Sequence, residues 1–153
     1  MLTPVHAERF APLDDETLEA WKPFMTWQDR TYFPMEVGLV VEEIRTDYAR
    51  MRLPFRPELN QPAGVVHGGA IATLIDTVVV PAIGQAYEIG RVYLTIGMNI
   101  SYLGAVVGED AIAEGWVEQR GRSIVFSAAE VRTESGKLAA QASLTYKVGK
   151  PTA

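Results

Sequence analysis

Residues His67–Tyr87, HGGAIATLIDTVVVPAIGQAY, are the stretch that decides the fold. Apolar residues recur in it every three or four positions: Ile71, Leu74, Ile75, Val78, Val79 and Ala82. That spacing predicts a long helix with a buried face. Small or polar residues share one narrow stripe on the opposite face: Gly69, Thr73, Asp76 and Val80. The helix is therefore apolar nearly all round, and Pro81 should bend its last turns because proline has no N–H to donate.

The chain before this helix reads as a covering helix followed by two strands. Residues 14–28 begin with acidic side chains, which suit a helix N-terminus, and Pro23 should end or kink that helix. Residues 36–45 and 47–55 alternate and are rich in Val, Ile and Tyr. This pattern predicts two strands with a turn near Thr46–Asp47.

Four strand-like runs follow the helix, joined by turns that contain glycine or serine: 92–103, 111–120, 123–133 and 138–148. Ala111, Ala113 and Gly115 share one face of their strand, and small side chains let a sheet curl closely around a helix. The sequence predicts an α+β fold, a long central helix wrapped by a curved antiparallel sheet of five to six strands. We expect one domain, residues 35–150, preceded by an N-terminal helical extension, residues 1–34.

Composition excludes several classes of function. The 153 residues carry a net charge of −5, which disfavours binding to nucleic acid or to an anionic membrane. There is no cysteine and there are only two histidines, so we expect no thiol nucleophile, no metal site and no metal cofactor. The first residues lack the pattern of a signal peptide, and Asp76 interrupts the longest apolar stretch. We therefore expect a cytoplasmic protein that does not cross a membrane.

Asp76 is the least expected residue for its surroundings. It lies between ATLI and TVVV on the helix that must be most buried. An ionised carboxylate there is costly unless it is paired or hydrogen-bonded, and such groups mark functional sites often but not always. The other interpretation is that Asp76 faces solvent through the small-residue stripe or bonds a neighbouring threonine.

The triplet His67-Gly68-Gly69 comes directly before the helix. Unpaired N–H groups at a helix N-terminus can stabilise an oxygen anion, and glycine leaves that backbone open to close approach. The alternative is a glycine-rich turn with a capping role, and a lone histidine such as His67 is more often structural than a base.

One subunit cannot bring these two features to the same atom. Asp76 is eight residues beyond Gly68, which places it about 12 Å along the helix axis and about 80° around it. If both act on one substrate carbonyl, Asp76 must come from a second copy, with two such helices antiparallel across a two-fold axis. The stripe of small residues suits that close approach.

Other catalytic schemes lack the residues they need. No Gly-x-Ser-x-Gly motif is present, the nearest being residues 121–125, GRSIV. There is no phosphate-binding loop, no Gly-x-Gly-x-x-Gly after a strand and no zinc signature. Arg120 and Arg122 lie near a predicted strand end, where a solvated edge and a phosphate site are both open interpretations.

Three segments in order resemble the hotdog-fold thioesterases of the phenylacetate-degradation (PaaI-like) type, which hydrolyse acyl-coenzyme A. They are residues 60–69, NQPAGVVHGG, residues 74–76, LID, and residues 95–103, TIGMNISYL. The resemblance covers roughly residues 36–148. It implies a hotdog fold with two active sites at the interface of a homodimer, often assembled further into a dimer of dimers, and an acyl-CoA substrate.

The resemblance also implies roles for individual residues. Asp76 matches the catalytic carboxylate, as general base or nucleophile, and Gly68 and Gly69 match the amides that polarise the thioester carbonyl. Asn60 matches the Asn before the glycine turn and Thr95 the hydroxyl that helps to place water. His67 matches a histidine that is structural or positions substrate.

The chain departs from the family pattern in two places. Asn60 lies seven residues before His67, where six is more common, and Gly104-Ala105 stand where a basic residue and proline often follow. Arg120 and Arg122 remain candidates for contacts with the phosphates of coenzyme A. Apolar candidates for an acyl pocket are Met98, Tyr102, Trp116 and Phe126.

Two other functions compete with hydrolysis. A non-catalytic hotdog module could sense or carry an acyl-CoA, but it would have no need of the costly Asp76. A hotdog dehydratase or hydratase would need a basic histidine beside the acyl chain. The sequence does not identify the acyl group.

Overall fold

The sheet of the protein has six antiparallel strands in the spatial order β1-β2-β4-β5-β6-β3. The structure is a computed structural model that describes residues 5–151. The strands are β1 Val40–Arg45, β2 Tyr48–Leu53, β3 Tyr93–Tyr102, β4 Ala111–Arg120, β5 Ile124–Thr133 and β6 Leu138–Val148. The helices are η1 Ala7–Arg9, α1 Asp15–Trp21, α2 Phe33–Val37, η2 Pro57–Leu59 and α3 Gly68–Gly84. In the part of the chain that is described, no helix is both long and apolar enough to cross a membrane.

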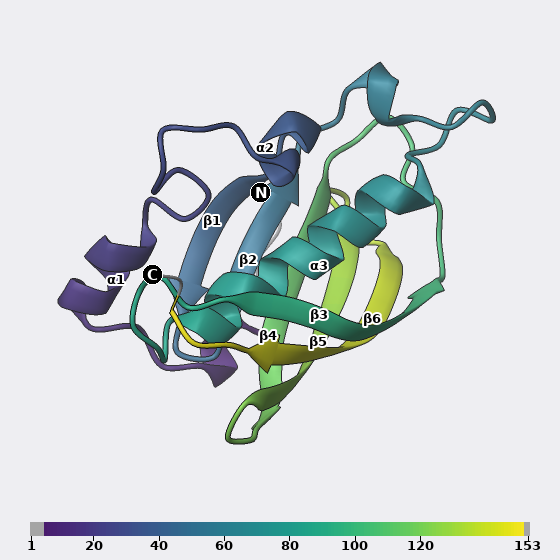
Figure 1. Ribbon diagram of the computed structural model, residues 1–153. Coiled ribbons are helices and arrows are strands. Elements are labelled where there is room, and N and C mark those ends of the chain that lie inside the picture. The colour runs from purple at the N-terminus through teal and green to yellow at the C-terminus, as the bar shows by residue number, and fades with distance from the viewer. Residues whose placement is uncertain (1–4, 152–153) are drawn as a thin grey trace.

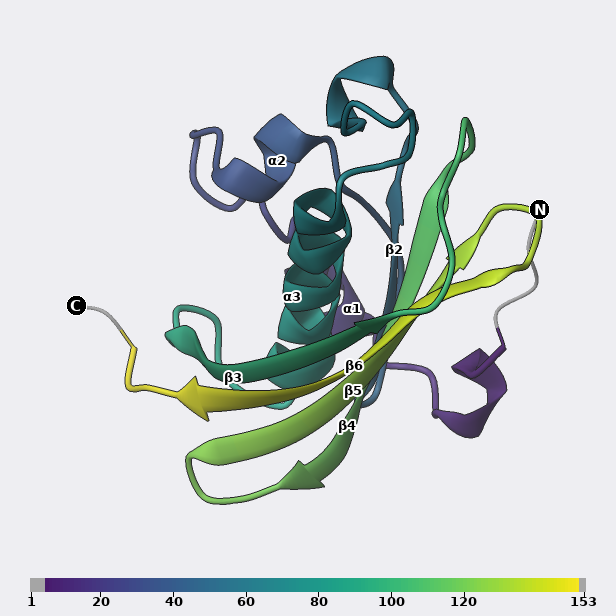
Figure 2. The same cartoon turned by 90° about the vertical axis from the view of Figure 1, so that its right-hand side faces the viewer.

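The long helix α3 lies in the concave side of the curved sheet, as predicted (Figures 1 and 2). The strand pairing places the small residues of β4 on this inner face, where Gly115 faces the helix. A side-chain Cβ at Gly115 would lie 2.8 Å from Val78 Cγ1 and 3.0 Å from Val79 Cγ1. The missing side chain therefore sets how closely the helix approaches the sheet.

The ends of α3 are fixed by local chemistry and by packing. The helix continues past Pro81 to Gly84, where a Cβ would overlap the ring of Trp21 from α1. Trp21 is buried, so the N-terminal extension closes the core at this end of α3. At the other end, His67 caps the helix.

One predicted boundary before the core is wrong. Residues 33–37 form the short helix α2 and not the start of a strand, because Pro34 suits a first helical turn and Gly38 ends the helix with φ of 94°. The first helix ends at Trp21, just before Pro23, in agreement with the prediction that this proline would end or kink it.

The first described residues bind the outer face of the sheet through a buried carboxylate. The side chain of Glu114 accepts hydrogen bonds from the Val5 and His6 amides, at 2.9 Å each, and from the Tyr48 hydroxyl at 2.6 Å. The ring of His6 lies 4.4 Å from that of Trp116. Trp116 thus belongs to the outer face and not to a pocket beside α3.

We predict that Gly115→Ala lowers the free energy of unfolding by about 1–3 kcal/mol, because a methyl group would push α3 away from β4. Gly97→Ala on β3 is the matched control, since its Cβ would meet Thr145 at an ordinary 3.7 Å. Its effect should stay below about 0.5 kcal/mol. Urea unfolding measures both, and equal effects of the two variants would contradict this account of the packing.

Alkaline pH should destabilise the protein. Burial raises the pKa of Tyr93 from 10.0 to about 12, and burial also raises the pKa of Tyr48 and Tyr146. Because the unfolded chain releases these protons first, the stabilisation is complete below about pH 10 and is lost as the pH rises through the folded values. Each such tyrosine should lower the free energy of unfolding by about 1.4 kcal/mol per pH unit in that window. Urea unfolding at pH 9, 10 and 11 measures the slope, and Tyr93→Phe should reduce it.

Candidate active site

The carboxylate of Asp76 is held by two hydroxyl groups of its own chain. Asp76 lies half-buried on α3, and its Oδ1 accepts a hydrogen bond from Thr95 Oγ1 at 2.8 Å. The hydroxyl of Tyr146 lies 2.5 Å from the same Oδ1 and 2.6 Å from the Asp76 carbonyl oxygen. No residue among 5–151 donates to Oδ2, so one carboxylate oxygen is held and the other is free.

Tyr146 is a residue of the candidate site that the sequence did not predict. It lies on β6, facing α3 and buried, and its one hydroxyl proton is shared between the side chain and the backbone of Asp76. Burial raises the pKa of Tyr146, and the nearby charge of Asp76 raises it further, so the phenol keeps its proton. The alternation of β6 places residue 146 on the inner face of the sheet. A tyrosine hydroxyl among the apolar residues of that face was the feature of the sequence that could have indicated a role for Tyr146.

The first turn of α3 presents one free amide. Gly69 N–H donates to His67 Nδ1 at 2.7 Å, so the neutral imidazole carries its proton on Nε2. The Gly68 carbonyl accepts from the Tyr102 hydroxyl at 2.9 Å. The Gly68 carbonyl and the Gly69 N–H therefore both have hydrogen-bond partners. The Gly68 N–H has no acceptor among residues 5–151. The helix dipole adds partial positive charge at this amide.

A hollow of about 220 Å³ lies beside this turn and is bordered by His67, Gly69, Thr73 and Asn60. We call it the His67 hollow. Asn60 Oδ1 is buried without a hydrogen-bond partner among the described residues. The neighbouring Gln61 differs, because its Oε1 accepts the Ala63 amide at 2.6 Å. The structure thus brings Asn60, His67 and Gly69 together around this hollow.

Gly68 borders a second hollow, of about 390 Å³, together with Tyr102 and Gly104. We call it the Tyr102 hollow. Tyr102 and Met98 are on the inner face of β3, as their pairing with Ala140 and Leu144 requires. Phe126 pairs with Thr145 on the outer face, so it cannot line either hollow. Of the four apolar pocket candidates, only those on β3 lie on the side of α3.

The two arginines proposed for phosphate contacts differ in their surroundings. Arg120 bonds Asp47 at 2.7 Å and the Ala82 carbonyl at 3.2 Å, and it lies over the ring of Tyr87, so it ties the end of α3 to the β1–β2 turn. Arg122 is exposed in the β4–β5 turn and has no ion pair with the described residues. Arg122 is therefore the freer of the two cations.

The sequence profile of the Thioesterase superfamily matches residues 63–140, about half of the chain, which include the helix start, Asp76 and Thr95. The chain belongs to the thioesterase superfamily. Over 94 residues it is 33% identical to human (Homo sapiens) acyl-coenzyme A thioesterase 13, and the match covers 60% of this chain and 66% of the relative. The chain therefore spans just under two thirds of that relative's length.

Solved structures share the fold. The PaaI protein of E. coli, from the phenylacetic acid degradation operon, has a TM-score of 0.78 and 16% identity, over 89% of this chain and 97% of that one. A hypothetical thioesterase of Streptococcus pneumoniae, solved with coenzyme A, has a TM-score of 0.69 and 18% identity, over 78% and 93%. The predicted hotdog fold and the resemblance to PaaI-like thioesterases are confirmed.

We predict that Tyr146→Phe lowers the free energy of unfolding by about 1.5–3 kcal/mol at neutral pH, because a half-buried carboxylate loses a hydrogen bond. Tyr93→Phe is the control, since the Tyr93 hydroxyl is buried without a partner among the described residues. It should leave stability unchanged or raise it. If urea unfolding gives the two variants the same loss, the bond to Asp76 does not stabilise the fold.

Proposed function

We propose that this protein hydrolyses acyl-CoA thioesters as a homodimer, with each active site built from both subunits. The observation that carries the proposal is the arrangement of α3. Its first turn presents the free Gly68 amide, and the free Oδ2 of Asp76 follows about 12 Å further along the same rigid helix. Within one chain, the Gly68 amide and the Asp76 carboxylate cannot act on the same thioester carbonyl. In a dimer whose two α3 helices run antiparallel, each site combines Gly68 of one subunit with Asp76 of the other.

The edge of the sheet supports such a dimer. Strand β3 ends the sheet, and its outer edge pairs with no other strand in residues 5–151. It exposes large apolar side chains, with Leu94 at 52%, Ile96 at 56% and Met98 at 40%. A long apolar edge strand left open invites pairing with another chain. Pairing of β3 with its copy across a two-fold axis would continue the sheet and bring the two α3 helices together.

In the proposed reaction, Gly68 N–H of one subunit polarises the thioester carbonyl while Asp76 of the partner drives the attack. Oδ2 either removes a proton from water as the water adds to the carbonyl carbon, or adds to that carbon itself. In both routes the C–S bond breaks, coenzyme A leaves as a thiolate that takes up a proton, and the acyl group becomes a free acid. In the second route water first cleaves the mixed anhydride.

The remaining site residues have supporting roles in this proposal. Thr95 and Tyr146 fix Oδ1 of Asp76, so that Oδ2 is the oxygen that reacts. His67 holds the Gly69 amide, which leaves Gly68 as the donor to the oxyanion. Asn60, with its unpartnered Oδ1, contacts the substrate, and Arg122 is the better candidate of the two arginines for the coenzyme A phosphates. The human acyl-coenzyme A thioesterase 13 and the neighbour solved with coenzyme A support the substrate class. A dimer of dimers stays a prediction.

Two variants remove the two halves of the site. Asp76→Asn keeps the shape of the side chain and should lower kcat by at least about a hundredfold. Gly68→Pro deletes the amide at the first helical position, where proline is favoured, and His67 already has the extended ψ of 135° that proline needs before it. It should lower kcat by about 100- to 1000-fold. Gly68→Ala keeps the N–H and is the matched control.

Mixing the two inactive variants tests the shared site. A dimer of one Asp76→Asn and one Gly68→Pro subunit has one intact site, so an equal mixture should recover about a quarter of the parent activity after subunit exchange. Thiol release from acyl-CoA measures it. No recovery, with dimers present, would contradict catalysis across the interface. Binding of acyl-CoA without thiol release by the parent would instead identify a carrier or sensor.

A further inference from the structure

The N-terminal helix α2 has no role in the proposed function so far, and it lies outside the segment that matches the thioesterase superfamily. It nevertheless borders the His67 hollow through Phe33 and Val37. We propose that α2 is the specificity wall of the active site and that Phe33 contacts the acyl group of the substrate. This inference rests on the proposed function, because it places an acyl-CoA thioester at Gly68.

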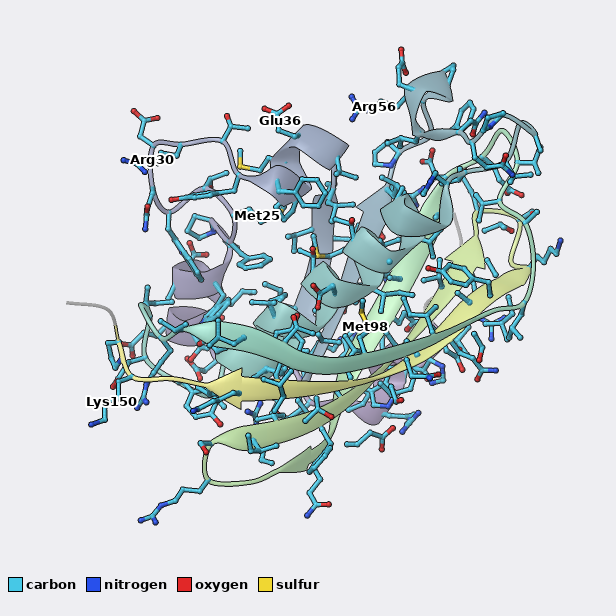
Figure 3. The ribbon with its side chains drawn as sticks, turned by 45° about the vertical axis from the view of Figure 1, so that its right-hand side comes forward. Met25, Arg30, Glu36, Arg56, Met98 and Lys150 are labelled. Atoms are coloured by element: carbon cyan, nitrogen blue, oxygen red, sulfur yellow. The ribbon has the colours of Figure 1, made fainter. Side chains whose placement is uncertain are left out.

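The position of α2 is fixed by bonds to the chain around the site. The Leu39 and Gly38 amides both donate to the Pro34 carbonyl, which closes the end of the helix. Arg56 Nη2 donates to the Glu36 carbonyl at 2.6 Å, and Figure 3 shows Glu36 and Arg56 at the same end of the molecule. Arg56 directly precedes η2, which leads to Asn60. Helix α2 is thus tied to the segment that carries a site residue.

The His67 hollow is apolar where α2 forms it. Phe33 is 67% exposed, and the lining continues through Val37, Leu59 and Ala70. When an apolar ligand covers an aromatic ring that is otherwise exposed to water, the loss of apolar surface from water favours binding. The polar residues His67 and Asn60, which belong to the segment that leads into α3, also line the hollow. An acyl chain against α2 would therefore leave its carbonyl toward the first turn of α3.

Charge distinguishes which end of the substrate enters each hollow. The one charged residue that lines the His67 hollow among the described residues is Glu58, whose carboxylate repels phosphate. Beside the Tyr102 hollow, the ammonium of Lys137 lies 3.3 Å from the point where a Cβ of Gly104 would stand. The coenzyme A arm, which carries the phosphates, thus fits the Tyr102 hollow, and the uncharged acyl end fits the His67 hollow.

Phe33→Ala tests the wall. We expect kcat/KM for hexanoyl-CoA and phenylacetyl-CoA to fall about tenfold, because the acyl group loses an apolar contact. An acetyl group offers Phe33 much less apolar surface than a hexanoyl or phenylacetyl group, so kcat/KM for acetyl-CoA should change less than about twofold. Ile89→Ala is the matched control, since Ile89 is an exposed apolar residue beyond the far end of α3. It should leave all three values unchanged.

An equal loss for all three esters, or no loss, would overturn the assignment of Phe33. A binding measurement separates this outcome from failure of the proposed function. In the Asp76→Asn background, calorimetry with hexanoyl-CoA should show about tenfold weaker binding after Phe33→Ala, and binding of free coenzyme A should not change. If the parent releases no thiol but Phe33→Ala still weakens the binding of hexanoyl-CoA, the proposed hydrolysis is wrong and the contact between Phe33 and the acyl group is supported. If the parent hydrolyses the esters but Phe33→Ala does not weaken binding, the proposed role of Phe33 is wrong and the proposed hydrolysis is supported.

Discussion

The close contact between α3 and β4 is the constraint on which the rest of the structure depends. Because Gly115 has no side chain, Val78 and Val79 reach the floor of the sheet. A helix held at this depth has little freedom to slide or rotate, since packed interiors tolerate only small changes in shape. The polar residue Asp76 on the open face of α3 is therefore held at a fixed place beside the sheet.

The position of Asp76 follows from that contact. On a helix held against the sheet, its carboxylate meets Thr95 on β3, the strand that follows α3 in the chain, and Tyr146 on β6, the strand that pairs with β3. The two hydroxyls compensate for the loss of water around Oδ1. The same rigid helix holds Gly68 about 12 Å away. Within one chain, the helix therefore keeps Asp76 and Gly68 apart. The proposed dimer brings Asp76 of one subunit and Gly68 of the other to the same substrate.

The N-terminal extension is part of the same arrangement. Trp21 closes one end of α3 through its contact with Gly84, and α2 borders the hollow at the other end. In the proposed function, the core of the fold polarises and attacks the thioester carbonyl, and the extension adds apolar surface beside it. Apolar contacts of this kind are one way in which enzymes distinguish substrates.

The sequence by itself determined the central helix, the six strands within a few residues, the small inner face of β4 and the separation of Asp76 from Gly68, because these depend on local periodicity. Short α2 was missed, since Pro34 and Gly38 act over fewer residues than a periodic pattern needs. The tertiary structure alone decided that Tyr146 and Thr95 share Asp76, that His67 engages the Gly69 amide, and that Arg120 is bound to Asp47. These contacts join residues distant in sequence or depend on the direction of a single bond, and only the folded chain fixes either one.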